Sequence, residues 1–157
     1  QQCDSRLPVF IRRPRSIRMT GALGIERTPD GHKIVVAREM LASQESAWNL
    51  LKDTQRWPEW GPSVRAVECD HRSIEPDTTG RVRIPGGLWI PFRIITCGSY
   101  RWTWRIAGIP ATGHRVDPPV RAVSEDRCRV VFELPVLAVG YAPVCIRALR
   151  RIESILS

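Results

Sequence analysis

The sequence predicts an α+β fold in which a curved antiparallel sheet wraps around a long C-terminal helix. Two observations predict it. Segments that alternate between apolar and polar residues follow one another from residue 64 to residue 136, with turn signals between them. The last segment, 141–156, instead carries one apolar stripe at helical spacing. A sheet with one apolar face and a helix with one apolar stripe are complementary layers, so each is expected to bury the other.

The chain is 157 residues long and 43% hydrophobic, an ordinary composition for a globular protein. Residues 34–157 are expected to form one domain, since no linker-like stretch divides them. Residues 1–33 show no clean period and are expected to form a basic, irregular arm that ends at the turn signal TPDG, 28–31. This arm carries seven Lys and Arg against three Asp and Glu, which is half of the net charge of +8.

Charge and cysteine usage exclude several classes of function. Outside the arm, basic residues are interleaved with acids, and no basic helix or aromatic-basic RNA-binding pattern occurs. Nucleic acid and anionic membranes are therefore not expected as partners beyond the arm. The cysteines are Cys3, Cys69, Cys97, Cys128 and Cys145. They are odd in number and form no CxxC pair, so neither a metal site nor a disulfide framework is expected, and a reducing cytoplasm is predicted. No cofactor is expected.

The first predicted strand is KIVVAREM, 33–40, a β-branched run. A short helix follows, with Ser43 as its N-cap and with apolar residues at helical spacing, and it must end before Pro58. The next stretch, TQRWPEWGPS at 54–63, contains two prolines and is not expected to be a regular helix. One tryptophan there, Trp60, is expected to pack on the core, and Trp57 is expected to face the mouth of a cavity.

Six further strands are predicted, at 64–71, 81–84, 88–96, 100–108, 112–117 and 128–136. The segment YRWTWRIAG, 100–108, alternates strictly. Its uncharged face would be concave and comprises Tyr100, Trp102, Trp104 and Ile106, whereas Arg101 and Arg105 would point to water. On the strand 128–136, Glu133 alternates with Phe132 and Leu134, so it is also expected to point outward. Arg81 and Arg83 are expected to face solvent, although the reverse register would bring Arg83 into the cavity to bind a carboxylate.

The closing segment, YAPVCIRALRRIESILS, predicts a helix with Pro143 in its first turn. Its apolar stripe comprises Cys145, Ala148, Leu149, Ile152, Ile155 and Leu156. Arginines occupy the opposite side, so the stripe must pack against the sheet.

The order of elements resembles the START-like (SRPBCC) superfamily with its helix-grip fold, and in particular the polyketide cyclase/dehydrase-like proteins. The residues that carry the resemblance are ESAWNLLKDTQRWPEWGPSVRAVE, 45–68, followed by GRVRIPGG, YRWTWRIAGIPATGHRV and VCIRALRRIESIL. It covers about residues 34–156. It implies a cavity between sheet and helix that takes a small hydrophobic molecule, but it does not imply a particular reaction, because this fold serves carriers, enzymes and receptors.

A hydrophobic or aromatic ligand is expected to contact eight residues: Trp57, Phe92, Tyr100, Trp102, Trp104, His114, Phe132 and Tyr141. His114 is the one catalytic candidate, since strand alternation with Val116 places it on the inner face, although a hydrogen-bonded core histidine is the more common case. His32 and His71 are expected at the surface. No GxSxG, HExxH, P-loop or GxGxxG motif occurs.

Three functions are therefore open. The leading hypothesis is binding of a small apolar ligand, with lipid binding included. The alternative is a polyketide cyclase- or dehydratase-like enzyme in which His114 is the polar group. The third is an interaction protein whose basic arm contacts an acidic partner, RNA or a membrane. A homodimer is compatible with all three.

Overall fold

The computed structural model describes residues 22–119 and 126–157. Within these residues, eight strands form one antiparallel sheet in the order β1-β2-β8-β7-β6-β5-β4-β3. The strands are β1 (Ala22–Thr28), β2 (Gly31–Met40), β3 (Ala66–Cys69), β4 (Thr79–Arg83), β5 (Trp89–Gly98), β6 (Arg101–Ile106), β7 (Ile109–Asp117) and β8 (Cys128–Leu134). The helical segments are α1 (Gln44–Lys52), η1 (Thr54–Arg56), α2 (Trp57–Trp60), η2 (Val136–Tyr141) and α3 (Ala142–Leu156). The predicted fold class is confirmed.

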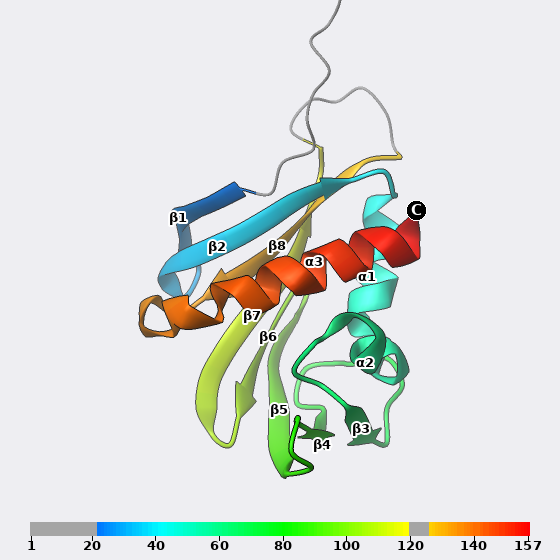
Figure 1. Ribbon diagram of the computed structural model, residues 1–157, viewed down its shortest axis with the longest axis vertical. Helices are drawn as coiled ribbons and strands as arrows, with labels where there is room; N and C mark the ends of the chain where they lie inside the picture. Colours follow the sequence, from blue (N-terminus) through cyan, green and yellow to red (C-terminus); the bar gives the residue numbers. More distant parts are fainter. Residues whose placement is uncertain (1–21, 120–125) are drawn as a thin grey trace, which may run out of the picture.

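The sheet curves around α3, which crosses its concave face, while α1 and α2 close one side of the same face (Figure 1). Register shifts in the β5–β6 pair and in the β6–β7 pair mark bulges, which bend and twist a sheet. The buried face of α3 is the stripe that the sequence predicts, from Cys145 to Ile152. An ion pair between Arg38 of β2 and Glu153 of α3 joins the helix to the sheet.

The short helices follow local rules, and one of them corrects an expectation. Ser43 caps α1 by accepting a hydrogen bond from the amide of Ser46 at 3.1 Å, as predicted. Residues 57–60 form a helical turn, α2, although the two prolines predicted otherwise. Pro58 lies in the first turn of α2, where backbone amides have no acceptor within the helix, so proline costs no hydrogen bond there. The Trp57 indole then donates to the carbonyl of Leu51, 2.9 Å away, at the end of α1.

The expectation of an irregular arm is wrong for residues 22–33. Residues 22–28 form β1, which pairs with β2 along its whole length, and β2 itself begins at Gly31. The turn signal TPDG is the connection of this hairpin. Thr28 donates to the carbonyl of Gly31 at 2.8 Å, and Gly31 has a φ of 97°, a value that favours glycine. Residues 1–21 of the arm, with Cys3, lie outside the described residues.

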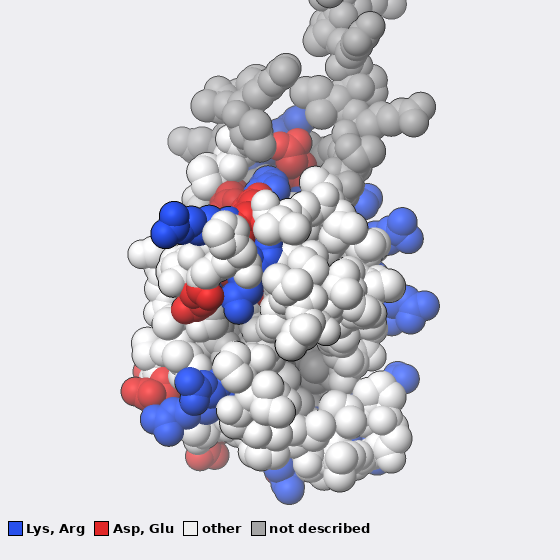
Figure 2. Space-filling model, turned by 90° about the vertical axis from the view of Figure 1, so that its left-hand side faces the viewer, with Lys and Arg blue, Asp and Glu red and all other residues white. Residues whose placement is uncertain are grey.

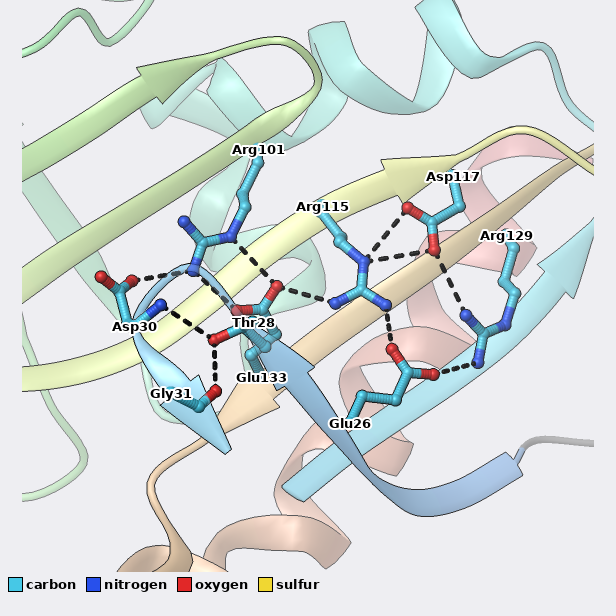
Figure 3. Close-up of polar contacts among 9 residues, drawn as sticks. All are labelled: Glu26, Thr28, Asp30, Gly31, Arg101, Arg115, Asp117, Arg129 and Glu133. Atoms are coloured by element: carbon cyan, nitrogen blue, oxygen red, sulfur yellow. Dashed lines mark hydrogen bonds and ion pairs between the residues drawn. The ribbon is translucent and has the colours of Figure 1, made fainter. Parts of the chain in front are cut away.

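Strand β1 covers part of the convex face of the sheet and closes an ion-pair network there (Figure 3). Glu133 lies at its centre, and the side chain is only 2% exposed. Each of its carboxylate oxygens accepts a hydrogen bond at 2.8 Å, one from Arg101 and one from Arg115. Further pairs extend the network to Glu26, Asp30, Asp117 and Arg129.

The network corrects two expectations about the convex face. Arg101 was expected in water, yet its side chain is 16% exposed, and Glu133 points outward from the sheet but is buried. Both corrections have the same reason: the β1–β2 hairpin shields these side chains from solvent and adds the carboxylates of Glu26 and Asp30 to the network. The other arginines that were predicted to face solvent, Arg81, Arg83 and Arg105, are exposed, and the reverse register of Arg83 does not occur.

Candidate ligand-binding site

Three stacked rings lie at the centre of the concave face. The Trp57 and Trp102 rings are nearly parallel, with centroids 5.4 Å apart, and the His114 ring stacks on Trp102 at 3.9 Å. Trp104 meets all three rings edge-on, with centroids 5.4 to 5.9 Å away. Strand alternation on β6 and β7 places Trp102, Trp104 and His114 on this face, and the α2 turn inserts Trp57 from the opposite side.

An inner cavity of about 40 Å³ lies between these rings and α3. Its walls include Trp60, Trp102, His114, Phe132 and Cys145. A volume of this size holds one or a few atoms the size of a water molecule, and not a whole ligand. The aromatic side chains therefore fill most of the space that the curvature of the sheet creates.

An outer groove of about 410 Å³ adjoins the inner cavity. Both spaces share five lining residues, which are Ser63, Val64, Trp104, Thr112 and Tyr141. The other walls of the groove are mostly apolar side chains from β4 to β8 and η2, among them Val82, Ile90, Ile106 and Leu134. Figure 2 looks onto this end of the molecule and shows a broad surface without charged side chains, hollowed near its middle. A groove of this size and polarity is typical of sites for small organic molecules.

A short hydrogen-bond chain joins Trp104, Thr112 and His114. The Trp104 indole donates to Thr112 Oγ1 at 3.1 Å, and the same oxygen lies 3.1 Å from His114 Nε2. If Thr112 accepted from both rings, its own hydroxyl proton would have no use, which is costly in a largely buried place. With Thr112 donating to His114 Nε2, the imidazole proton lies on Nδ1.

Three residues of the inner cavity carry buried ring nitrogens without a hydrogen-bond partner. Within the described residues, the indole Nε1 of Trp60, the indole Nε1 of Trp102 and His114 Nδ1 are buried and have no hydrogen-bond partner. All three residues line the inner cavity. With the proton on Nδ1, all three groups are donors, so a matching ligand atom would be an acceptor such as a carbonyl oxygen. Leaving one such group unpaired costs about 1–3 kcal/mol.

Six of the eight sequence-predicted ligand residues line the two spaces: Trp57, Trp102, Trp104, His114, Phe132 and Tyr141. Trp57 is not at the mouth, because it is 1% exposed and lies beneath Trp102. Phe92 lines neither space and supports Trp57 and Trp104 from behind. Tyr100 lies in the β5–β6 turn with a φ of 60°, outside the strand, so the alternation does not extend to it, and it packs on Trp48 instead.

Sequence reasoning missed the wall that follows α2 and one residue of β7. The segment Gly61–Val64 forms one wall, and Tyr141 of η2 hydrogen-bonds to Ser63 across the boundary between groove and cavity. Thr112 was also missed, although its alternation with His114 on one strand gives it the same side of the sheet. Within the described residues, no cluster of three or more His, Cys, Asp or Glu side chains could hold a metal ion. None of the helices described is long and apolar enough to cross a bilayer.

Burial lowers the pKa of His114 to about 3, so the ring is neutral near pH 7. We expect its imidazole NMR signals to stay constant between about pH 5 and pH 8. The unfolded chain takes up the proton at its ordinary pKa of 6.5, so stability should fall with decreasing pH between 6.5 and about 3. His114→Phe, which keeps a ring in the stack, should remove this part of the pH dependence of the free energy of unfolding. A His114 signal that titrates near pH 6.5 would contradict the burial argument.

Comparisons with known proteins bear on the fold. No protein-family model matches the chain, and no curated protein matches its sequence. Among solved structures, a START superfamily protein from Mycobacterium smegmatis superimposes with a TM-score of 0.60 at 13% identity, covering 80% of this chain and 97% of that one. CalU16 from Micromonospora echinospora superimposes with a TM-score of 0.56 at 18% identity, covering 87% of this chain and 82% of that one. XoxI from Bacillus cereus superimposes with a TM-score of 0.61 at 15% identity, covering 78% of this chain and 93% of that one. The protein therefore has the START-like, helix-grip fold.

Proposed function

We propose that this protein binds a small, largely apolar molecule that carries an acceptor oxygen. The observation that carries the proposal is the apolar outer groove of about 410 Å³, which shares its inner wall with the donor-lined inner cavity. The apolar body would occupy the groove. The oxygen would point past Trp104 and Thr112 toward the inner cavity. Burial of the body supplies most of the binding free energy, and the oxygen sets its orientation.

The structural neighbours support the same class of function. Proteins with the START-like fold typically bind hydrophobic ligands, and the groove here lies between the sheet, Ser63 and Val64 of the segment after α2, and η2. The neighbours do not identify a ligand, since likeness at this level of identity concerns the fold. The chemistry of the site adds the acceptor oxygen, because the unpaired groups in the inner cavity are donors.

The alternative, a polyketide cyclase- or dehydratase-like enzyme, stays a prediction. If such a reaction occurs here, His114 would act by hydrogen-bonding a substrate oxygen through its Nδ1 proton. Its lowered pKa keeps the ring neutral, so it is a poor proton donor or acceptor near pH 7. The cyclase prediction therefore needs positioning of the substrate as the main source of the rate.

Filling the groove should abolish binding of an apolar probe. Ala138 lines the groove, whereas the adjacent Val139 does not and is 54% exposed. We expect Ala138→Trp to weaken binding of anilinonaphthalene sulfonate at least about tenfold, measured by its fluorescence, because the indole would occupy the groove. Val139→Trp adds the same side chain to the same turn and should leave the affinity unchanged. Equal effects of both changes, or no binding to the wild type, would contradict the proposal.

The acceptor oxygen can be tested with a matched pair of competitors. Tetralin and tetralone have nearly the same apolar body, but only tetralone has a carbonyl. We expect tetralone to displace the probe at a concentration at least about fivefold lower than tetralin, since its oxygen meets an otherwise unpaired donor. Trp60→Phe keeps an aromatic ring and removes one donor, so it should reduce this ratio. Equal competition by both compounds would leave the groove as a purely apolar site.

A further inference from the structure

Three loops around the mouth of the outer groove expose aliphatic side chains to solvent. The β4–β5 loop presents Leu88, which is 64% exposed, and the β6–β7 hairpin presents Ile109, the first residue of β7, which is 68% exposed. The η2 segment presents Leu137, which is 101% exposed, beside the half-exposed Val136 and Val139. Aliphatic side chains of this size that are mostly exposed on three neighbouring segments make an apolar surface of a kind that monomeric proteins rarely carry.

The three loops lie at one end of the molecule, because each is flanked by walls of the same groove. Ile84 and Ile90 enclose the first loop, Ile106 and Pro110 enclose the second, and Pro135 and Ala138 enclose the tip of the third. In Figure 1 the β6–β7 hairpin and η2 are at the left, with the β4–β5 hairpin below. The exposed residues Leu88, Ile109 and Leu137 thus form a rim around the groove.

The rim is cationic as well as apolar. Segments 84–90, 105–111 and 135–141 contain no Asp or Glu. Arg83 precedes the first loop and packs beside Gly87 at its tip, where an added Cβ would lie 3.2 Å from the guanidinium. Arg105 precedes the second loop, and both arginines are exposed. Neither has an ion-pair partner among the residues that the structure describes.

We infer that this rim docks the protein on an anionic lipid bilayer, with the mouth of the groove facing the membrane. The aliphatic tips would enter the boundary between headgroups and acyl chains, and Arg83 and Arg105 would contact lipid phosphates. A second copy of the chain fits less well, since a symmetric contact through the rim would bring unpaired arginines together without an acid to meet them. From the sequence, only the basic arm suggested a membrane contact, whereas the rim lies in the folded domain.

The test is cosedimentation of the full chain with vesicles of equal parts phosphatidylglycerol and phosphatidylcholine. We expect Leu137→Asp and Ile109→Asp each to weaken binding at least about tenfold, because each places a charge where an apolar tip enters the membrane. Leu41→Asp is the matched control, since Leu41 is also an exposed leucine, at 55%, but follows β2 at the far end from the rim. It should leave binding unchanged. Arg83→Glu should weaken binding and reduce its dependence on salt.

Several outcomes would overturn the inference. One is an absence of binding to these vesicles, and another is an equal loss in Leu41→Asp and Leu137→Asp. Binding that persists in Leu137→Asp but is lost on deletion of residues 1–21 would assign the contact to the arm. A dimer seen by light scattering that Leu137→Asp dissociates would assign the rim to a second copy. Ala138→Trp, which blocks the groove, should keep vesicle binding, so failure of the groove proposal and failure of this inference give different results.

Discussion

Trp102→Ala should lower the free energy of unfolding by about 3–5 kcal/mol, the range for large aromatic side chains removed from a core. Trp102 is fully buried and lies between the rings of Trp57 and His114, so its removal opens a space that neither neighbour fills without leaving its own contacts. Chemical denaturation at neutral pH measures the effect. For a domain of this length, the melting temperature should fall by roughly 6–20 °C.

A control substitution at another tryptophan shows whether the loss of stability is specific to Trp102. Trp89 is partly exposed at the start of β5, where the Arg81 guanidinium lies 4.7 Å from its ring centroid. We expect Trp89→Ala to cost about 1 kcal/mol or less, as for exposed cation–π pairs. Trp102→Phe should cost less than Trp102→Ala because a ring still fills part of the stack. Equal losses at Trp102 and Trp89 would show that the stack is not the centre of the core.

The inner face of the sheet was predictable because strand alternation is a local property. The pattern in YRWTWRIAG places Trp102 and Trp104 on one side and the arginines between them on the other. The same period places His114 and Phe132 on that side from the neighbouring strands. The apolar stripe of α3 then needs such a face to bury itself. Period alone therefore identified the layer that contains the candidate site.

The size and opening of the cavity could not be predicted from period. Whether the space between sheet and helix is open depends on how rings from different segments fit together. Trp57 of α2 was expected at the mouth of the cavity, but it stacks on Trp102 and fills part of that space. The strand β1 was missed because Gly24 interrupts a weak pattern in ALGIERT, although the turn at TPDG followed by a strong strand does indicate a hairpin. The buried position of Glu133 depends on that strand and was missed with it.

Glu133→Ala should destabilise the protein by about 3 kcal/mol, the lower end of the range for removing one partner of a buried ion pair. The change leaves Arg101 and Arg115, which are 16% and 15% exposed, without their shared carboxylate. The lower end applies because Asp30 and Glu26 still pair with these arginines. Glu68→Ala is the control, since Glu68 and its partner Arg81 are 54% and 50% exposed, and it should cost about 0–1 kcal/mol.

The pH dependence of Glu133→Gln gives a sharper test, because it depends on the charge and not only on the shape of the side chain. Burial raises the pKa of the Glu133 carboxyl, but the hydrogen bonds from Arg101 and Arg115 more than offset this and hold the pKa below its ordinary value of 4.5. A carboxyl with a lowered pKa in the folded state stabilises the protein fully above pH 4.5 and loses that contribution as the pH falls through the lowered value. The stability difference between wild type and Glu133→Gln should therefore be constant from neutral pH down to about 5 and shrink in stronger acid. The effect of His114 is common to both proteins and cancels in this difference. A difference that does not change with pH would show that Glu133 contributes through packing, and that the network on the convex face is held by its outer pairs.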